Sequence, residues 1–131
     1  MNASHVVSQG LAVELKEAGW PCDSEFCWVR DTAYVDDNSV YREASEPYLM
    51  SRSLRGIRAG YEVIAPAPLA SELMESIPGS VLIWVASVGT TCETYWFCQG
   101  QDQPCFHRET LPDALAKLTL HLMKENKLNL E

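Results

Sequence analysis

The stretch that most constrains the fold is residues 109–131, because it has the pattern of a long amphipathic helix. Thr110 can cap the first free amides, Pro112 suits the first turn, and Asp113 stands where a capping box has its acid. Two lysines fall in the last turn, where cations suit the helix dipole. The apolar side chains recur at three- and four-residue steps and make one stripe: Leu111, Ala114, Leu115, Leu118 and Leu122. We therefore expect this helix to lie on a sheet.

Two further helices are predicted upstream. Residues 4–18 repeat apolar side chains every four residues after Ser4, a suitable cap, and Gly19 ends that helix. Residues 68–77 form the second helix, which Pro68 opens and the pair Pro78-Gly79 stops.

Several short segments have strand patterns. Residues 80–88 have almost no polar break, so we expect a central strand that is covered on at least one face. The next strand should pair with it as an antiparallel hairpin, on which Trp84 and Trp96 are candidates for cross-strand neighbours in or near the core. The predicted strands cover residues 26–30, 60–65, 80–88, 92–98 and 104–107.

A polar segment at residues 36–60 lacks a steady period. We predict a long irregular loop there, with a short helix near residues 48–54, while residues 32–35 either continue the first strand or pair back after a turn. The order of elements predicts an α+β fold: a small antiparallel or mixed sheet with two or three helices packed on it as a two-layer sandwich. At 131 residues the chain is most simply a single domain, residues 1–131.

The net charge and the length of the apolar runs argue against some classes of function. The formal net charge of −8 favours solubility and argues against wrapping nucleic acid as the main role, but it permits a basic partner or mimicry of nucleic acid. The longest apolar run, residues 81–86, is too short to cross a bilayer, and the N-terminus lacks the pattern of a signal peptide. We therefore expect an acidic cytoplasmic protein that does not associate with membranes.

Several stretches together resemble one family. They read GWP at 19–21 after the first helix, YEVIAPAPLASELMESIP at 61–78, and ETLPDALAKL at 109–118 followed by LMKENKL at 122–128. They are similar to a family of small uncharacterised proteins encoded in bacteriophage and prophage genomes. The chain departs from the family pattern at Ala67, where a capping threonine is usual, and the resemblance does not cover residues 31–60. It implies a phage-type accessory protein and no catalytic residue or cofactor.

Three arginines, Arg52, Arg55 and Arg58, recur every third residue in an otherwise acidic chain. On a helix they would make one guanidinium-rich face. Such a face would suit phosphates or carboxylates, because the planar guanidinium binds both with two hydrogen bonds. The simpler interpretation is a solvated loop whose charge is balanced by nearby acidic residues.

The cysteines raise two further hypotheses. Cys92, Cys98, Cys105 and His107 offer sulfur and nitrogen ligands, but they lack the tight C-x-x-C pair of most zinc sites, so we expect buried thiols and no metal. Cys105 and His107 are the best pair for a thiolate with a base, because residues two apart share one face of a strand. The alternative is that His107 is an edge residue beside a packed thiol. The odd number of cysteines, five, argues against a disulfide framework.

The sequence shows no phosphate-binding glycine loop, nucleotide fingerprint or paired catalytic carboxylates, so it favours a protein that is not an enzyme and needs no cofactor. The leading hypothesis is a protein–protein interaction module whose binding surface is residues 36–60 or an uncovered sheet face. The alternative is a nucleic-acid-related role, through the arginines or through acidic mimicry, and the third hypothesis is a thiol or zinc enzyme. An uncovered strand edge would also allow a symmetric homodimer.

Overall fold

A computed structural model describes residues 3–20, 24–55, 60–88 and 93–125. These ranges contain four α-helices, a 3₁₀ turn and antiparallel strands, so the predicted α+β class is confirmed. The helices are η1 (Ala3–His5), α1 (Gln9–Glu17), α2 (Arg52–Arg55), α3 (Ala70–Ser76) and α4 (Leu111–Lys124). The strands are β1 (Phe26–Asp31), β2 (Tyr34–Val35), β3 (Tyr41–Arg42), β4 (Tyr48–Ser51), β5 (Tyr61–Pro66), β6 (Val81–Val88), β7 (Glu93–Gly100) and β8 (Cys105–Arg108).

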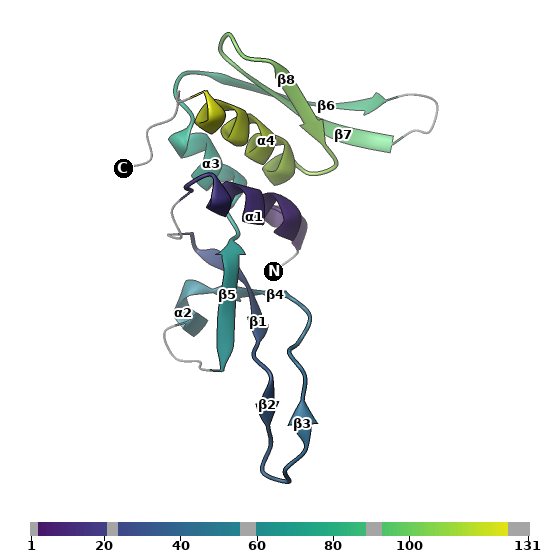
Figure 1. Cartoon of the computed structure of the whole chain (residues 1–131). Helices are drawn as coiled ribbons and strands as arrows, with labels where there is room; N and C mark the ends of the chain where they lie inside the picture. The colour runs from purple at the N-terminus through teal and green to yellow at the C-terminus, as the bar shows by residue number, and fades with distance from the viewer. Residues whose placement is uncertain (1–2, 21–23, 56–59, 89–92, 126–131) are drawn as a thin grey trace.

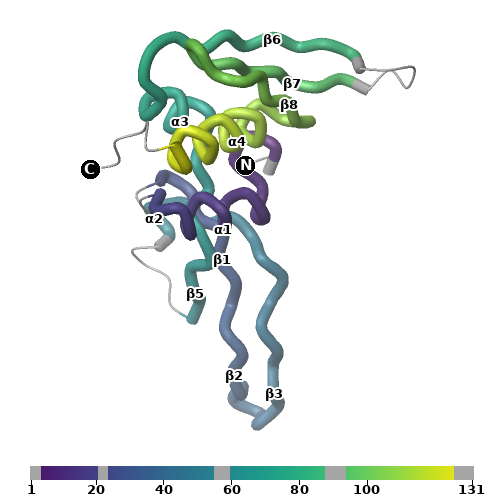
Figure 2. Tube along the Cα trace, turned by 45° about the horizontal axis from the view of Figure 1, so that its top comes forward, coloured from purple at the N-terminus to yellow at the C-terminus, as the bar shows by residue number. Residues whose placement is uncertain are grey.

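The strands form three small sheets, where the sequence analysis expected one. Their orders are β4-β1-β5, β2-β3 and β6-β7-β8. Helices α1, α3 and α4 lie between the two three-stranded sheets, as Figures 1 and 2 show from two directions. Helix α4 packs on β7 and β8, α1 packs on β5, and α4 also contacts α1 and α3. The β2–β3 hairpin extends away from this body at the end opposite to β6 (Figures 1 and 2).

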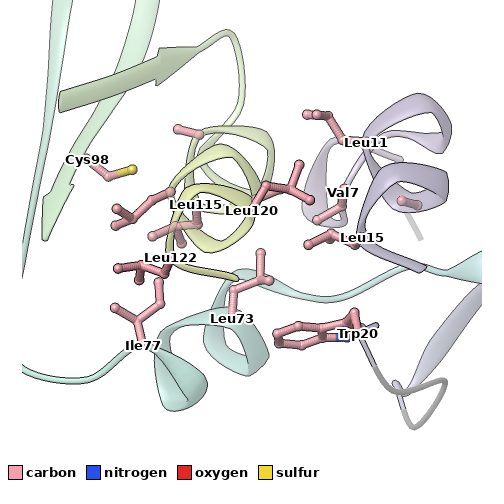
Figure 3. Packing of buried hydrophobic residues seen from close by; sticks show 14 of the residues in the cluster. Val7, Leu11, Leu15, Trp20, Leu73, Ile77, Cys98, Leu115, Leu120 and Leu122 are labelled. Carbon is pink, nitrogen blue, oxygen red and sulfur yellow. The ribbon is translucent and has the colours of Figure 1, made fainter. Parts of the chain in front are cut away.

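One main apolar cluster holds the helices together (Figure 3). The predicted stripe of α4 is part of it, with Leu115, Leu118 and Leu122 buried. Leu120, which lies off that stripe, is also buried, because α4 is covered by β7 and β8 on one side and by α1 and α3 on the other. The helix therefore buries more than the single face that its periodicity predicted.

The start of α4 follows the predicted capping pattern in part. The Thr110 side chain accepts a hydrogen bond from the backbone amide of Asp113 at 3.4 Å, and Pro112 stands in the first turn. The Asp113 carboxylate accepts a hydrogen bond from the backbone amide of Ser8 at 2.7 Å. Ser8 is the N-cap residue of α1, so α1 begins later than the predicted cap at Ser4. This contact joins the starts of two helices that are more than a hundred residues apart in sequence.

Helix α1 ends where the sequence predicted. Gly19 has a φ of +107°, which favours glycine because a Cβ is strained there. Its amide donates to the carbonyl of Lys16 at 3.1 Å, and the amide of Trp20 donates to the carbonyl of Leu15 at 2.8 Å. These two bonds close the helix in a Schellman motif and turn Trp20 into the core.

Within residues 36–55, the part of the predicted loop that the structure describes, there are strands and a short helix. Residues 48–51 form strand β4, where a helix was expected, and α2 is a single turn. The pairing of β4 with β1 places Met50 opposite Cys27, and both are buried with Val29 in a second apolar cluster. Burying these side chains requires a partner strand from a distant part of the chain, which local periodicity does not show.

Among the described residues strand β6 lies at an edge of its sheet, so the prediction of a central strand is wrong for that part of the chain. The predicted β6–β7 hairpin and the edge position of β8 are both confirmed. Trp84 stands opposite Phe97, and Trp96 stands opposite Val85, so the two tryptophans are on opposite faces of the sheet and are not neighbours. Trp84 is 39% exposed and is not part of the core.

The contact between Asp113 and Ser8 can be tested by substitution. We expect Asp113→Ala to lower the free energy of unfolding by about 1–2 kcal/mol, because it removes a hydrogen bond to a charged group and a carboxylate at a helix start. Urea denaturation at neutral pH measures the change. Asp37→Ala, at an exposed position, serves as the control and should stay within about 0.5 kcal/mol of the wild type. Equal losses in the two variants would contradict this role for the contact.

Candidate functional site

The three arginines of the predicted recognition face are only partly described. Arg52 begins α2 and is exposed, and its backbone amide donates to the carbonyl of Glu25 at 2.8 Å. Arg55 is the last residue of α2, and its side chain and the whole of Arg58 lie outside the described residues. The arginine face therefore stays a prediction.

Cys105 and His107 lie on the same exposed face of β8, as their spacing predicted. The His107 ring stacks on Phe97, with centroids 5.2 Å apart, and meets Tyr95 edge-on at 5.7 Å. His107 is thus part of an aromatic row, while its relation to the Cys105 thiol as a base stays a hypothesis.

Cys98 lies on the other face of the sheet and is buried against the helices. Burial, with a smaller contribution from the nearby charge of Cys105, raises the pKa of Cys98 to about 12. Its thiol is therefore protonated at neutral pH and is a poor nucleophile. Cys92 lies outside the described residues, and within the described ranges no three or more histidine, cysteine, aspartate or glutamate side chains are grouped so that they could hold a metal.

A pocket of about 590 Å³ lies where η1, the first turns of α3 and α4, and β7 meet. Leu69, Trp96 and Leu111 supply apolar parts of its lining. Both of its ionisable side chains, His5 and Glu109, are exposed, whereas a catalytic acid or base is usually desolvated to tune its pKa. The pocket is large enough for a small molecule, but its chemistry does not favour catalysis.

The strongest candidate for a binding surface is the β2–β3 hairpin with its turn, residues 34–42, which we call the arm. It extends away from the body of the protein (Figures 1 and 2). The register places Val35 opposite Tyr41 on one face and Tyr34 opposite Arg42 on the other. Large apolar side chains on both faces are between 46% and 65% exposed: Tyr34, Val35, Val40 and Tyr41.

Asp36 organises the turn at the tip of the arm. Its Oδ1 accepts hydrogen bonds from the amides of Asn38 and Val40, both at 2.9 Å, and its Oδ2 accepts one from Nε of Arg42 at 3.0 Å. Ser39 has a φ of +62° and donates its amide to the carbonyl of Asp36 at 2.9 Å. The hydrogen bond from the Val40 amide, aided by those from Arg42 and Asn38, lowers the pKa of Asp36 below its usual value. The carboxylate is therefore ionised at neutral pH.

The root of the arm is tied to the body. The amide of Asp31 donates to the Ser45 hydroxyl at 2.8 Å, and the amide of Ser45 donates to the Asp31 carbonyl at 3.1 Å. The Tyr48 hydroxyl donates to the Asp31 carboxylate at 2.6 Å. These bonds join the end of β1 to Ser45 and to the first residue of β4. The chain segments that enter and leave the arm are therefore fixed to each other, and the arm leaves the body in a defined direction.

The arm has the physical character of a segment that another molecule covers. A two-stranded hairpin alone is marginally stable in water, and this one exposes tyrosine and valine on both faces. Tyrosine is enriched among the residues that dominate binding energy at interfaces. The sequence predicts a binding surface in residues 36–60 or on an uncovered sheet face, and this prediction does not single out the four apolar residues of the arm as a group. The turn residues DDNS at 36–39, between Tyr-Val and Val-Tyr, are the pattern that would have found it.

The role of Asp36 is open to a direct test. Because its pKa is lowered, the stabilisation from its charged form is complete above its usual pKa of 3.8 and is lost as the pH falls through the lower value of the folded protein. We expect the Val40 amide to titrate below pH 3.8 in NMR spectra. Asp36→Ala should speed hydrogen exchange at Asn38 and Val40, because the arm loses the stabilisation that the charged carboxylate gives. Asp37→Ala should leave both amides unchanged. Unaltered exchange in Asp36→Ala would show that the carboxylate does not organise the turn.

The cysteines predict a pattern of thiol reactivity. In the folded protein at neutral pH, Cys105→Ser should remove one rapidly reacting thiol, because Cys105 is exposed. Cys98→Ala should leave the number of rapid thiols unchanged, because the Cys98 thiol is buried and protonated. Titration with a chromogenic disulfide reagent, with and without denaturant, measures both. A rapid thiol that disappears with Cys98→Ala would contradict the burial of this side chain.

No helix in the described part of the chain is long and apolar enough to span a membrane. Comparison of the chain with protein-family models, with curated proteins and with solved structures gave no match. The resemblance to phage and prophage proteins therefore stays a prediction from sequence motifs, and the arm is a candidate on its geometry alone.

Proposed function

We propose that this protein is a non-enzymatic protein–protein interaction module that binds its partner through the arm. The observation that carries the proposal is the exposure of Tyr34, Val35, Val40 and Tyr41 on a hairpin whose turn and root are both hydrogen-bonded. A pre-ordered arm loses little conformational entropy on binding, which favours affinity.

The charges of the arm indicate the chemistry of the partner. Asp36 is paired with Arg42, whereas Asp37 in the arm and Glu43, directly after it, are exposed. The whole chain carries a formal charge of −8. A complementary partner is a protein with an apolar cleft, which receives the tyrosines, and basic residues at its rim.

The sequence motifs support a more specific role. Their resemblance to phage and prophage proteins favours an accessory protein that binds a protein of the bacterial host or of the phage. We expect it to act in the cytoplasm, where the thiols of Cys98 and Cys105 would stay reduced.

The test compares matched surface variants. We expect the double variant Tyr34→Ser/Tyr41→Ser to lose a partner that the wild type captures from a nuclease-treated bacterial lysate at low and moderate salt. Val63→Ser is the control, because Val63 is 42% exposed on β5, in the body of the protein. With the purified partner, the arm variant should bind at least about 30-fold more weakly, as expected for interface hot spots.

Three outcomes of this experiment carry information. Loss of the partner with the arm variant alone, at an unchanged melting temperature, would support the arm as the binding site. Equal capture by all three proteins would overturn the proposal. Material that is captured from an untreated lysate but lost after nuclease treatment would overturn it in favour of the nucleic-acid-related role, with the arginines as the first residues to substitute.

A further inference from the structure

Strand β6 is an edge strand with the composition of a central one. Its eight residues, VLIWVASV, include no charge and no proline, and its register with β7 runs without a bulge. Among the described residues only β7 pairs with it, so along its other edge alternate backbone N–H and C=O groups have no strand partner. Proteins usually protect such an edge with charged residues, proline, a bulge or a short strand, and β6 has none of these.

Both faces of β6 are uncovered along part of its length. Helix α4 packs on β7 and β8, and β6 lies farther from it (Figure 2). On the outer face Leu82 is 65% and Trp84 is 39% exposed. Val85 points to the same side as the core-packed Ile83, yet it is 48% exposed. A strand added beside β6 would therefore bury apolar side chains on both faces as well as pair the backbone.

An aromatic row on the outer face ends at this edge. The rings of Trp84 and Phe97 stack with centroids 5.5 Å apart and planes 7° apart, and Phe97 stacks in turn on His107. The row runs from β8 across β7 to β6, where Trp84 is its last member. A partner strand at the edge would cover the open side of the Trp84 ring.

The other edges of the two three-stranded sheets are less suited to strand addition. Strand β5 carries Glu62, which is paired with Arg30 of β1, and ends at Pro66. Strands β4 and β8 have four residues each, and β8 carries His107 and Arg108. Among these edges, β6 is the longest and has no charged residue.

We propose that β6 pairs antiparallel with β6 of a second copy of this chain, which joins two three-stranded sheets into one of six strands across a twofold axis. A twofold axis perpendicular to the sheet places each face of β6 beside the same face of its copy, so outer side chains meet outer side chains. Every pair of opposing residues is then uncharged, in any register that the symmetry allows. Two copies that each carry −8 can thus meet here without bringing like charges together at the contact.

The size of the contact sets the expected affinity. An eight-residue strand is roughly 26 Å long at about 3.3 Å per residue, and its edge buries on the order of several hundred Å² on each copy. This is at the low end for specific interfaces, so we expect a concentration-dependent dimer with a dissociation constant in the micromolar range. The arm is at the opposite end of the molecule and stays available in the dimer (Figure 1).

Sedimentation equilibrium of the full chain from micromolar to millimolar concentration tests the proposal. The wild type should approach twice its mass of 14.7 kDa as the concentration rises. Leu82→Lys/Val85→Lys, at two exposed positions of β6, should raise the dissociation constant at least about 100-fold, because it puts like charges on both faces of the pair. Val63→Lys, at a similarly exposed position of β5, should associate like the wild type. A wild type that stays monomeric, or a β6 variant that dimerises unchanged, would overturn the proposal.

Hydrogen exchange provides a second measurement that needs no variant. Amides of alternate β6 residues should exchange more slowly as the concentration rises through the dissociation constant, while amides of β5 should not change. A dimer that forms without this protection would overturn the pairing of β6. The arm variant Tyr34→Ser/Tyr41→Ser should still dimerise, so failure of the arm as a binding site and failure of the β6 pairing are separate results.

Discussion

The structure depends on the burial of α4 on two sides. Leu115 lies on the side of the helix that faces Cys98 of β7, whereas Leu120 points toward Leu11 of α1 (Figure 3). Helix α4 therefore joins the β6–β7–β8 sheet to α1 and α3. Helix α1 in turn packs on β5 and so connects α4 to the β4–β1–β5 sheet. A 14-residue helix covers only the elements directly against it. The arm and β6 lie beyond that cover, so their exposed apolar side chains follow from how far the helix layer reaches.

The parts of the fold that could be predicted from the sequence are those that local interactions decide. The cap at Thr110, the stop at Gly19 and the β6–β7 hairpin each involve residues that are close to one another in sequence. The parts that were wrong depend on distant partners. Residues 48–51 are a strand because β1 lies beside them. Trp84 is exposed because none of the described helices covers the outer face of its sheet. The arm was missed although its turn is local, because a polar segment of 25 residues was interpreted as one loop.

The wrong prediction for β6 has a physical interpretation. An uninterrupted apolar strand is typical of the middle of a sheet, where neighbours on both edges use its backbone groups. Within the described part of a single chain, β6 has one neighbouring strand, β7. In the proposed pair of copies, β6 is one of the two central strands of a six-stranded sheet. Its uncharged, apolar composition, which led to the prediction of a central strand, then suits its position. Each copy would then present one arm, so the dimer would hold two binding surfaces and gain affinity for any partner with two sites.

The two proposed contacts differ in their electrostatics, so each favours a different kind of partner. The arm carries the exposed acidic residue Asp37, and the exposed Glu43 directly follows the arm, so attraction to a basic rim would weaken as salt screens it. Strand β6 is uncharged, and the net charge of −8 on each copy opposes association, so salt should favour pairing there by screening that repulsion. A basic partner groove would draw the arm but gain nothing from β6, and a second acidic copy would be repelled by the arm but accepted at β6. The two proposed contacts would therefore not compete, because a second copy and a different protein would use separate surfaces.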